Sequence, residues 1–294
     1  IFFDGTGDED ESDPAIRHVL VDDSGAIARI SADPIDAPGA RRIDAAGQWV
    51  MPGFLDTHTH YDAELLVSPG LTESVRHGVT SVLVGSCSLS TIYSSPEDCA
   101  DLFSRVEALP HEHVSRVLEE HKTWTSASEY IECLERLALG PNLMAFAGHS
   151  DIRTSVMGLD RSVDPKVRPS STEMQEMETR LEAALDAGLL GMSSMTNPWD
   201  KVGGERQRSK RLPSTYATWG EYRRLHAILR RRERILQSAP NITTKVNILA
   251  FMAETASLFF RKTLKTALIT AADAKSTPML IRPLLFGTSL INRV

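Results

Sequence analysis

The chain has 294 residues, of which 41% are hydrophobic and 24% charged, and 32 basic against 39 acidic side chains give a net charge of −7. This composition is typical of a globular protein and argues against disorder and low-complexity assembly. The mildly acidic balance gives no support for nucleic-acid binding, and the apolar runs are far shorter than the roughly 20 residues that cross a bilayer. We therefore expect a globular protein that binds neither nucleic acid nor membrane.

Three cysteines stand far apart in the sequence: Cys87, Cys99 and Cys133. An odd, sparse set is unlike the dense spacing of a disulfide scaffold, so we expect a reducing compartment and a cytoplasmic location. The chain begins with Ile1 and shows no signal-peptide pattern, which is weak information because the true start of the protein can lie upstream.

The first 50 residues differ from the rest. Residues 17–30 hold two short apolar stretches around Asp23-Ser24-Gly25, which predicts a β-hairpin, and another short stretch, 42–44, precedes Gly47. We expect residues 1–50 to form part of a small β-structure, with a domain boundary near residue 50.

After residue 50, apolar runs alternate with amphipathic helices, the pattern of βα units and a parallel sheet. Helix starts are expected at 95–97, 126–129, 170–173 and 218–221, the last three as capping boxes, and a helix with an apolar face formed by Met174, Met177, Leu181 and Leu185 ends before Gly188. The predicted strands are 49–55, 80–84, 143–147, 189–192, 235–236 and 265–270.

The first of these strands leads into His58 and His60. Residues two apart on an extended strand point to the same side, so both imidazoles can converge on one metal ion. The alternative is a pair of solvated loop histidines. Cys87 ends the next strand in the same way and offers a thiolate ligand for zinc, although a buried free cysteine is an equally good interpretation of that residue alone.

Two segments carry a family resemblance: MPGFLDTHTHYD at 51–62 and HGVTSVLVGSC at 77–87. They resemble the amidohydrolase superfamily, and within it the N-acyl-D-amino-acid deacylases (D-aminoacylases). The match covers about residues 1–195 and is supported by further segments at 3–7, 43–47, 148–153 and 183–193.

The resemblance implies a zinc-dependent hydrolase on a (β/α)8 barrel beside a small β-sandwich, with metal-activated water and a late aspartate that moves protons. His58 and His60 match the paired histidine ligands of the family, and Cys87 matches the cysteine that this branch uses between its metal sites. Residues 1–50 then correspond to part of the β-sandwich and residues 51–294 to the barrel.

Two further family histidines, at the ends of the fifth and sixth strands, are absent, because those places read Gln237 to Asn241 and Thr270 to Asp273. The later His226 fits a helix pattern and is expected at the surface. With Asp273 or Asn241 as a possible further ligand, the remaining set fits a single-metal site.

Two other residues are candidates for the substrate site. His149 ends the third strand and can position metal or substrate, and a hydrogen-bonded structural histidine is the alternative. Arg153 can bind a carboxylate through its fork of donors, against the alternative of an ordinary surface or capping arginine.

Eight βα units take about 250 residues, and two more cannot fit after the sixth strand. We therefore expect about six of eight barrel strands, the general base beyond Val294, and an inactive chain when it is made alone. The expected activity is zinc-dependent hydrolysis of a linear, non-peptide amide bond in a small N-acyl amino acid. The alternatives are a cyclic amide substrate or a catalytically degenerate scaffold. A run of arginines at 223–234 favours a solvated helix face over nucleic-acid binding.

Overall fold

The computed structural model describes residues 2, 16–106, 108–241, 245–255 and 262–269. The chain divides into two compact units, Ile1–Phe54 and Leu55–Val294, close to the boundary expected near residue 50. Asp273, considered above as a possible ligand, lies outside the described residues.

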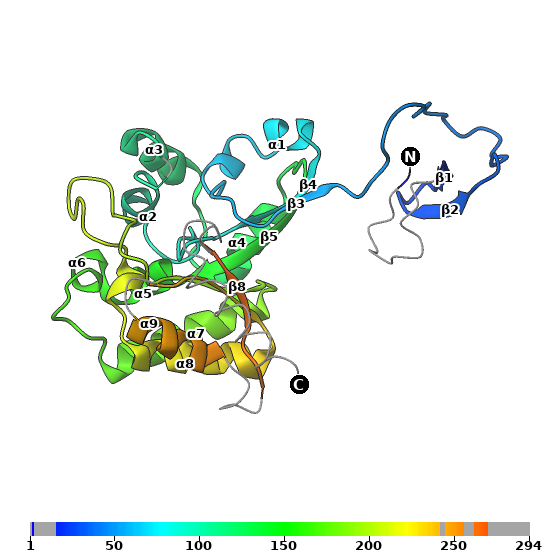
Figure 1. The fold of residues 1–294 in the computed structure, drawn as a ribbon. Coiled ribbons are helices and arrows are strands. Elements are labelled where there is room, and N and C mark those ends of the chain that lie inside the picture. The colour runs from blue at the N-terminus through cyan, green and yellow to red at the C-terminus, as the bar shows by residue number, and fades with distance from the viewer. Residues whose placement is uncertain (1, 3–15, 107, 242–244, 256–261, 270–294) are drawn as a thin grey trace. The chain divides into compact units, whose positions relative to one another are not determined.

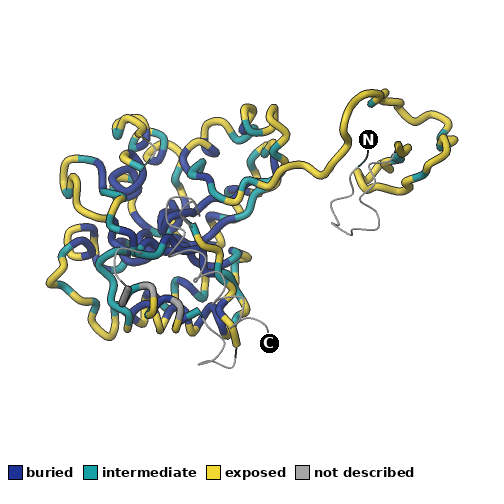
Figure 2. The backbone as a smooth tube through the Cα atoms, viewed as in Figure 1, coloured by how far each residue is buried: buried dark blue, intermediate teal, exposed yellow. Residues whose placement is uncertain are grey.

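The first unit contains the expected hairpin, formed by β1 (His18–Val21) and β2 (Ile27–Ser31) in antiparallel pairing. The Asp22 carboxylate closes the turn by accepting from the amides of Ser24 at 2.9 Å and Ala26 at 3.1 Å. None of the described residues of this unit is buried (Figure 2). The hairpin therefore has no core of its own.

The second unit is built on a six-stranded sheet in the order β3-β4-β5-β6-β7-β8, and the pairs from β4 to β8 are parallel (Figure 1). Neighbours in the sheet are also neighbours in the chain, as in a (β/α) barrel. All six predicted strands are confirmed. The strands are β3 (Phe54–Asp56), β4 (Val79–Val84), β5 (Asn142–Gly148), β6 (Gly191–Met195), β7 (Ile235–Ala239) and β8 (Lys265–Leu268).

Helices connect successive strands, and α7 packs against both α5 and α8. The α-helices are α1 (Thr72–Arg76), α2 (Pro96–Phe103), α3 (His111–His121), α4 (Ala127–Glu135), α5 (His149–Met157), α6 (Leu159–Ser162), α7 (Ser171–Asp186), α8 (Trp219–Arg232) and α9 (Lys245–Thr255). Two 3-10 helices are η2 (Glu64–Leu66) and η3 (Pro213–Tyr216).

Helix starts follow the predicted capping chemistry with one difference. Ser126 and Ser170 form complete capping boxes, and Ser95 caps α2 ahead of Pro96. Thr218 caps α8 by accepting from the Glu221 amide, but the Glu221 carboxylate bonds to buried side chains, so the box predicted there is only half formed. Tertiary pairing of that carboxylate has replaced the local contact.

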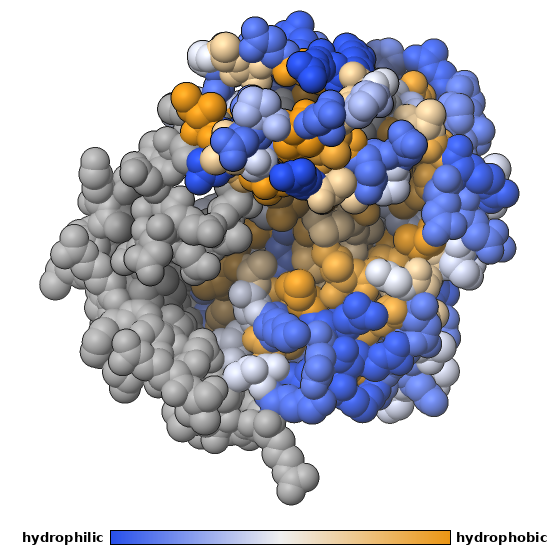
Figure 3. All heavy atoms as spheres, turned by 90° about the vertical axis from the view of Figure 1, so that its right-hand side faces the viewer, coloured by the Kyte–Doolittle hydropathy of each residue, from blue (hydrophilic) through white to orange (hydrophobic). Residues whose placement is uncertain are grey.

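The core lies between the sheet and its helices (Figure 2). The predicted apolar face of α7 is confirmed, since Met174, Met177, Leu181 and Leu185 are all buried. A space-filling view shows apolar residues gathered in a hollow that is edged by polar residues (Figure 3). Separately, a cleft of about 590 Å³ lies at the amino-terminal ends of β4 and β5.

The carboxyl end of β4 continues into a loop that Asp151 of α5 holds in place. The buried Asp151 carboxylate accepts hydrogen bonds from the amides of Ile92, Tyr93 and Ser94 at 2.7–3.0 Å, and from the Ser90 hydroxyl at 2.6 Å. Charge-assisted bonds of this kind are the strong ones in proteins. They fix the loop that begins at the carboxyl end of β4, where Cys87 lies.

Among the helices of the described residues, none has the length and apolar character needed to cross a membrane.

Candidate metal centre

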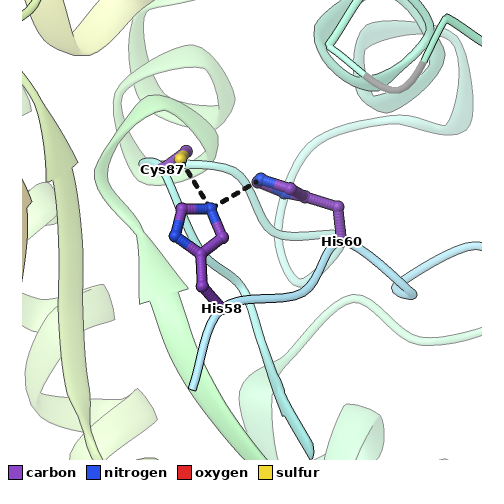
Figure 4. A group of neighbouring side chains, drawn as sticks. All are labelled: His58, His60 and Cys87. Carbon is purple, nitrogen blue, oxygen red and sulfur yellow. Dashed lines mark hydrogen bonds between the residues drawn. The ribbon is translucent and has the colours of Figure 1, made fainter. Parts of the chain in front are cut away.

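Three side chains converge at the carboxyl ends of β3 and β4. His58 and His60 follow β3, and Cys87 follows β4. The Nε2 atoms of the two histidines lie 3.2 Å apart, and the Cys87 sulfur lies 3.2 Å from Nε2 of His58 (Figure 4). All three donor atoms lie within 4.8 Å of one another, so the structure brings together the three ligands predicted from the sequence.

The separations can be compared with those around a zinc ion. Bonds of about 2.0–2.1 Å to nitrogen and about 2.3 Å to sulfur, at tetrahedral angles, place two nitrogens about 3.3 Å apart and nitrogen and sulfur about 3.6 Å apart. The two contacts of 3.2 Å, from Nε2 of His58 to Nε2 of His60 and to the Cys87 sulfur, are within a few tenths of an ångström of these values. Two imidazoles and a thiolate are therefore a chemically and geometrically suitable zinc set, with room for a fourth ligand.

Burial keeps both imidazoles ready to bind a metal at neutral pH. It lowers the pKa of His60 to about 4, and the neighbouring His58 adds to the effect. Burial also lowers the pKa of His58, although the carboxylates of Asp56 and Asp200 oppose the shift. A neutral imidazole is the form that ligates a metal, so neither ring must lose a proton on binding at pH 7.

The loop that presents Cys87 has an unusual backbone. Gly85 has φ +74°, and the two non-glycine residues Cys87 and Ser88 have φ +55° and +70°. A Cβ on residue 85 would lie 2.1 Å from the carbonyl oxygen of Phe146, so glycine is required there on both counts. Left-handed residues at consecutive positions persist only when their surroundings hold them.

Polar side chains from the next strands hold this loop. Ser193 of β6 accepts from the Ser88 amide at 3.0 Å and donates to the Gly85 carbonyl at 2.5 Å. The hydroxyls of Ser88 and Ser150 lie 2.7 Å apart. The strained geometry is thus supported by a buried network, which is typical of functional loops.

His149 and Arg153 do not join this group. Both are fully buried on α5 and bond to Glu221 of α8: Nε2 of His149 lies 3.0 Å from its carboxylate, and Nη1 of Arg153 donates to the other oxygen. Nδ1 of His149 contacts the Ser214 hydroxyl at 2.9 Å. Both side chains are thus buried and paired within the protein, and their role in substrate binding stays a prediction.

Two residues near the centre were not selected from the sequence as site residues. Asp200, in the segment after β6, is close enough for its charge to act on His58, and burial raises its pKa. The Gln237 side chain contacts the backbones of both ligand-bearing segments. No sequence motif marks Asp200, whereas Gln237 was visible only as a departure from the family pattern.

The surface position predicted for His226 is wrong. Its side chain is 2% exposed on the inner side of α8, with Nδ1 3.7 Å from the Glu254 carboxylate. Leu225 and Leu229 lie on the same buried side of α8. The many arginines of this helix make its buried side hard to recognise from the sequence.

The arginines of α8 form ion pairs with carboxylates of neighbouring helices. The pairs are Arg224 with Glu178, Arg231 and Arg232 with Glu182, Arg232 with Asp186, and Arg223 and Arg230 with Glu254. The run is therefore a paired helix face.

Comparison with known sequences places this geometry in a family context. No family model matches the chain. An uncharacterised protein of Mycobacterium tuberculosis is 49% identical over 296 residues, which cover 100% of this chain and 48% of that protein. The N-acyl-D-glutamate deacylase of Alcaligenes xylosoxydans xylosoxydans is 34% identical over 169 residues, 58% of this chain and 30% of that enzyme. The D-aminoacylase of the same organism is 29% identical over 173 residues, 56% of this chain and 32% of that enzyme.

The chain is thus similar in sequence to D-aminoacylases and to deacylases of N-acyl-D-glutamate and N-acyl-D-aspartate. It spans about half the length of the mycobacterial protein, and about a third of the two deacylases. The resemblance stated from its sequence motifs is confirmed.

Solved structures show the same fold. A D-aminoacylase structure superposes with a TM-score of 0.63 at 24% identity, covering 89% of this chain and 51% of the other chain. An N-acyl-D-glutamate deacylase from Bordetella bronchiseptica, complexed with zinc and a phosphonate inhibitor, gives 0.62 at 22% identity, covering 89% and 50%. A barrel-type sheet of six strands, together with a separate small antiparallel sheet, is thus confirmed as the fold class.

Proposed function

We propose that this chain forms the metal-binding part of a hydrolase that cleaves the linear amide bond of a small N-acyl amino acid. The observation that carries the proposal is the convergence of His58, His60 and Cys87 at the carboxyl ends of two adjacent barrel strands. Active sites of barrel enzymes lie at this end of the sheet. The chemistry of the named deacylase relatives supports the substrate class.

The proposed cofactor is one zinc ion held by these three side chains. When bound, zinc supplies a Lewis acid that polarises an amide carbonyl and activates water at neutral pH. Two imidazoles and one thiolate leave a coordination position open, which a catalytic site requires. A solved D-aminoacylase is described with a binuclear centre that shows one-metal activation, so a single ion is compatible with this kind of chemistry.

The protein side of the site supports a small substrate. A cavity of about 120 Å³ adjoins His60 and is bordered by Phe103, Leu109 and Val114, which suits a short apolar acyl group. The thiolate ligand also requires a reduced cysteine, in agreement with the cytoplasmic location expected from the sparse cysteines.

Metal content tests the ligand assignment. We expect about one zinc per chain in the wild-type protein and a large loss in His58→Ala and Cys87→Ala. His77→Ala is the matched control, because the His77 side chain is 71% exposed and lies outside the three-residue group. Zinc content that is equal in His58→Ala and His77→Ala would remove the assignment.

Substrate hydrolysis tests the reaction. N-acetyl-D-amino acids and hydantoin-type rings, offered to the zinc-loaded full-length protein, separate the linear from the cyclic amide. Hydrolysis of the linear substrate is the expected result. Cleavage of the ring alone would transfer the proposal to cyclic amides, and zinc binding without either reaction would identify a degenerate scaffold.

A further inference from the structure

Gln237 of β7 occupies the region where the family resemblance leads one to expect a histidine ligand at the end of the fifth strand. Its side chain is 2% exposed. Zinc sites use nitrogen, sulfur and carboxylate ligands in preference to a neutral amide. A buried amide at this place therefore needs a role other than ligation.

The two ends of the Gln237 amide bond to the two segments that carry the proposed ligands. Oε1 accepts from the Cys87 backbone amide at 3.4 Å, and Nε2 donates to the Thr57 carbonyl at 3.3 Å. Thr57 directly precedes His58. One side chain thus spans from the His58 segment after β3 to the Cys87 loop after β4.

The orientation of the amide is determined by its partners. A backbone N–H can only donate and a carbonyl can only accept, so the oxygen must face Cys87 and the nitrogen must face Thr57. Reversing the amide would place two donors together and two acceptors together. The contact is therefore specific for a side chain with one donor and one acceptor at this length.

We propose that Gln237 is a positioning residue for the metal centre, setting the separation between His58 and Cys87 through their backbones. The inference rests on the proposed function, because it assumes that these residues bind the ion. Both bonds are longer than the usual 2.9–3.0 Å, so each is weak and adds little to folding stability. We infer that they instead fix the position of the Cys87 loop, whose residues 87 and 88 are left-handed, relative to the His58 segment.

Three variants test the proposal. Gln237→Met keeps the side-chain length and removes both hydrogen bonds, while Gln237→Glu keeps the acceptor for Cys87 and loses the donor to Thr57. Ser238→Ala is the matched control. Its hydroxyl is equally buried on the same strand and bonds to Ser194 at 3.0 Å, away from both ligand segments.

Zinc affinity is measured by competition with a chromophoric chelator, and the ligand geometry by the sulfur-to-cobalt charge-transfer band of the Co²⁺-substituted protein. Outer partners of metal ligands typically change affinity about 10- to 100-fold. We expect a loss in this range for Gln237→Met with an altered cobalt band, a smaller loss for Gln237→Glu, and wild-type behaviour for Ser238→Ala. The urea midpoint of the metal-free protein should change little in Gln237→Met and Ser238→Ala, and should fall in Gln237→Glu, which buries a carboxylate beside the Thr57 carbonyl.

Several results would overturn the inference. The first is a Gln237→Met protein with wild-type zinc affinity and cobalt spectrum. The second is failure of both Gln237 variants to fold while Ser238→Ala folds, since the residue would then support the core and not the centre. Absence of zinc from the wild-type protein would instead contradict the proposed function. The zinc content of the wild-type protein therefore separates that outcome from a failure of the inference on Gln237.

Discussion

Replacement of Glu221 by glutamine should strongly destabilise the chain. The Glu221 side chain is 1% exposed and its carboxylate lies between the fully buried Arg153 and His149. Glutamine keeps the size of the side chain, so no cavity complicates the result, but the Arg153 guanidinium loses its opposite charge. Removing one partner of a buried ion pair costs about 3–5 kcal/mol, because the remaining charge stays buried without compensation.

Urea unfolding followed by circular dichroism measures this loss. A slope of about 2–3 kcal/mol per molar urea converts it to a midpoint shift of roughly 1–2 M. Glu178→Gln is the matched control. The Arg224–Glu178 pair is well formed at 2.6 Å but its side chains are 46% and 25% exposed, so about 1 kcal/mol or less is expected.

A double variant completes the test of the buried pair. Arg153→Met combined with Glu221→Gln removes both charges, and the total loss should be clearly smaller than the sum of the two single losses. Equal losses in Glu221→Gln and Glu178→Gln, or strict additivity in the double variant, would refute the interpretation of a desolvated charge pair.

Three further outcomes are expected. Gly85→Ala should lower the free energy of unfolding in urea by about 2–4 kcal/mol, because residue 85 is left-handed and the added Cβ would overlap the Phe146 carbonyl. Gly188→Ala should lower it less, since its added Cβ meets no atom within 4 Å. Equal losses in the two variants would exclude the overlap. Ser170→Ala should lose about 1 kcal/mol by removing a capping box, and no change in the thermal midpoint would contradict it. Because the pKa of His60 is about 4 in the folded protein and near 6.5 when unfolded, the stability of the metal-free protein should be complete above pH 6.5 and fall by roughly 2–3 kcal/mol as pH drops from 7.5 to 4.5. That pH dependence should be weaker in His60→Asn, and an unchanged dependence would show that another group causes it.

The strands were predictable from the sequence because the central strands of a parallel sheet are buried on both faces and appear as short apolar runs. Strand ends were less certain. The first predicted run begins at residue 49, whereas β3 is confined to Phe54–Asp56, and β7 continues beyond Leu236 through the polar Gln237 and Ser238 to Ala239. Ser238 bonds to Ser194 of β6, and Gln237 bonds to the segments that follow β3 and β4. A hydropathy pattern cannot reveal such partners.

The candidate site shows the same division. The convergence of His58, His60 and Cys87 could be predicted because the two histidines are two residues apart after one strand and the cysteine follows the next strand, as in the family pattern. The partners of Gln237 lie 150 and 180 residues away, so its role depends on the tertiary fold and not on local spacing.

The buried interior also hid the surroundings of His149. Glu221, its partner, appears in the sequence as the fourth residue of the predicted capping box that begins at Thr218. The sequence pattern predicts that the Glu221 carboxylate bonds to the Thr218 amide, whereas in the fold it bonds to His149 and Arg153. Only the packing of α5 against α8 determines which of the two forms.

The contacts of Asp151 divide the long connection from β4 to β5 into two parts. Every one of its hydrogen bonds to this connection falls on residues 90–94, ahead of the capping residue of α2. The helical excursion from Ser95 to Gly140 also supports this segment, because Lys122 and Trp124 donate to the carbonyls of Ile92 and Thr91. The loop that presents Cys87 is therefore held from two sides, by Asp151 of α5 and by the excursion itself.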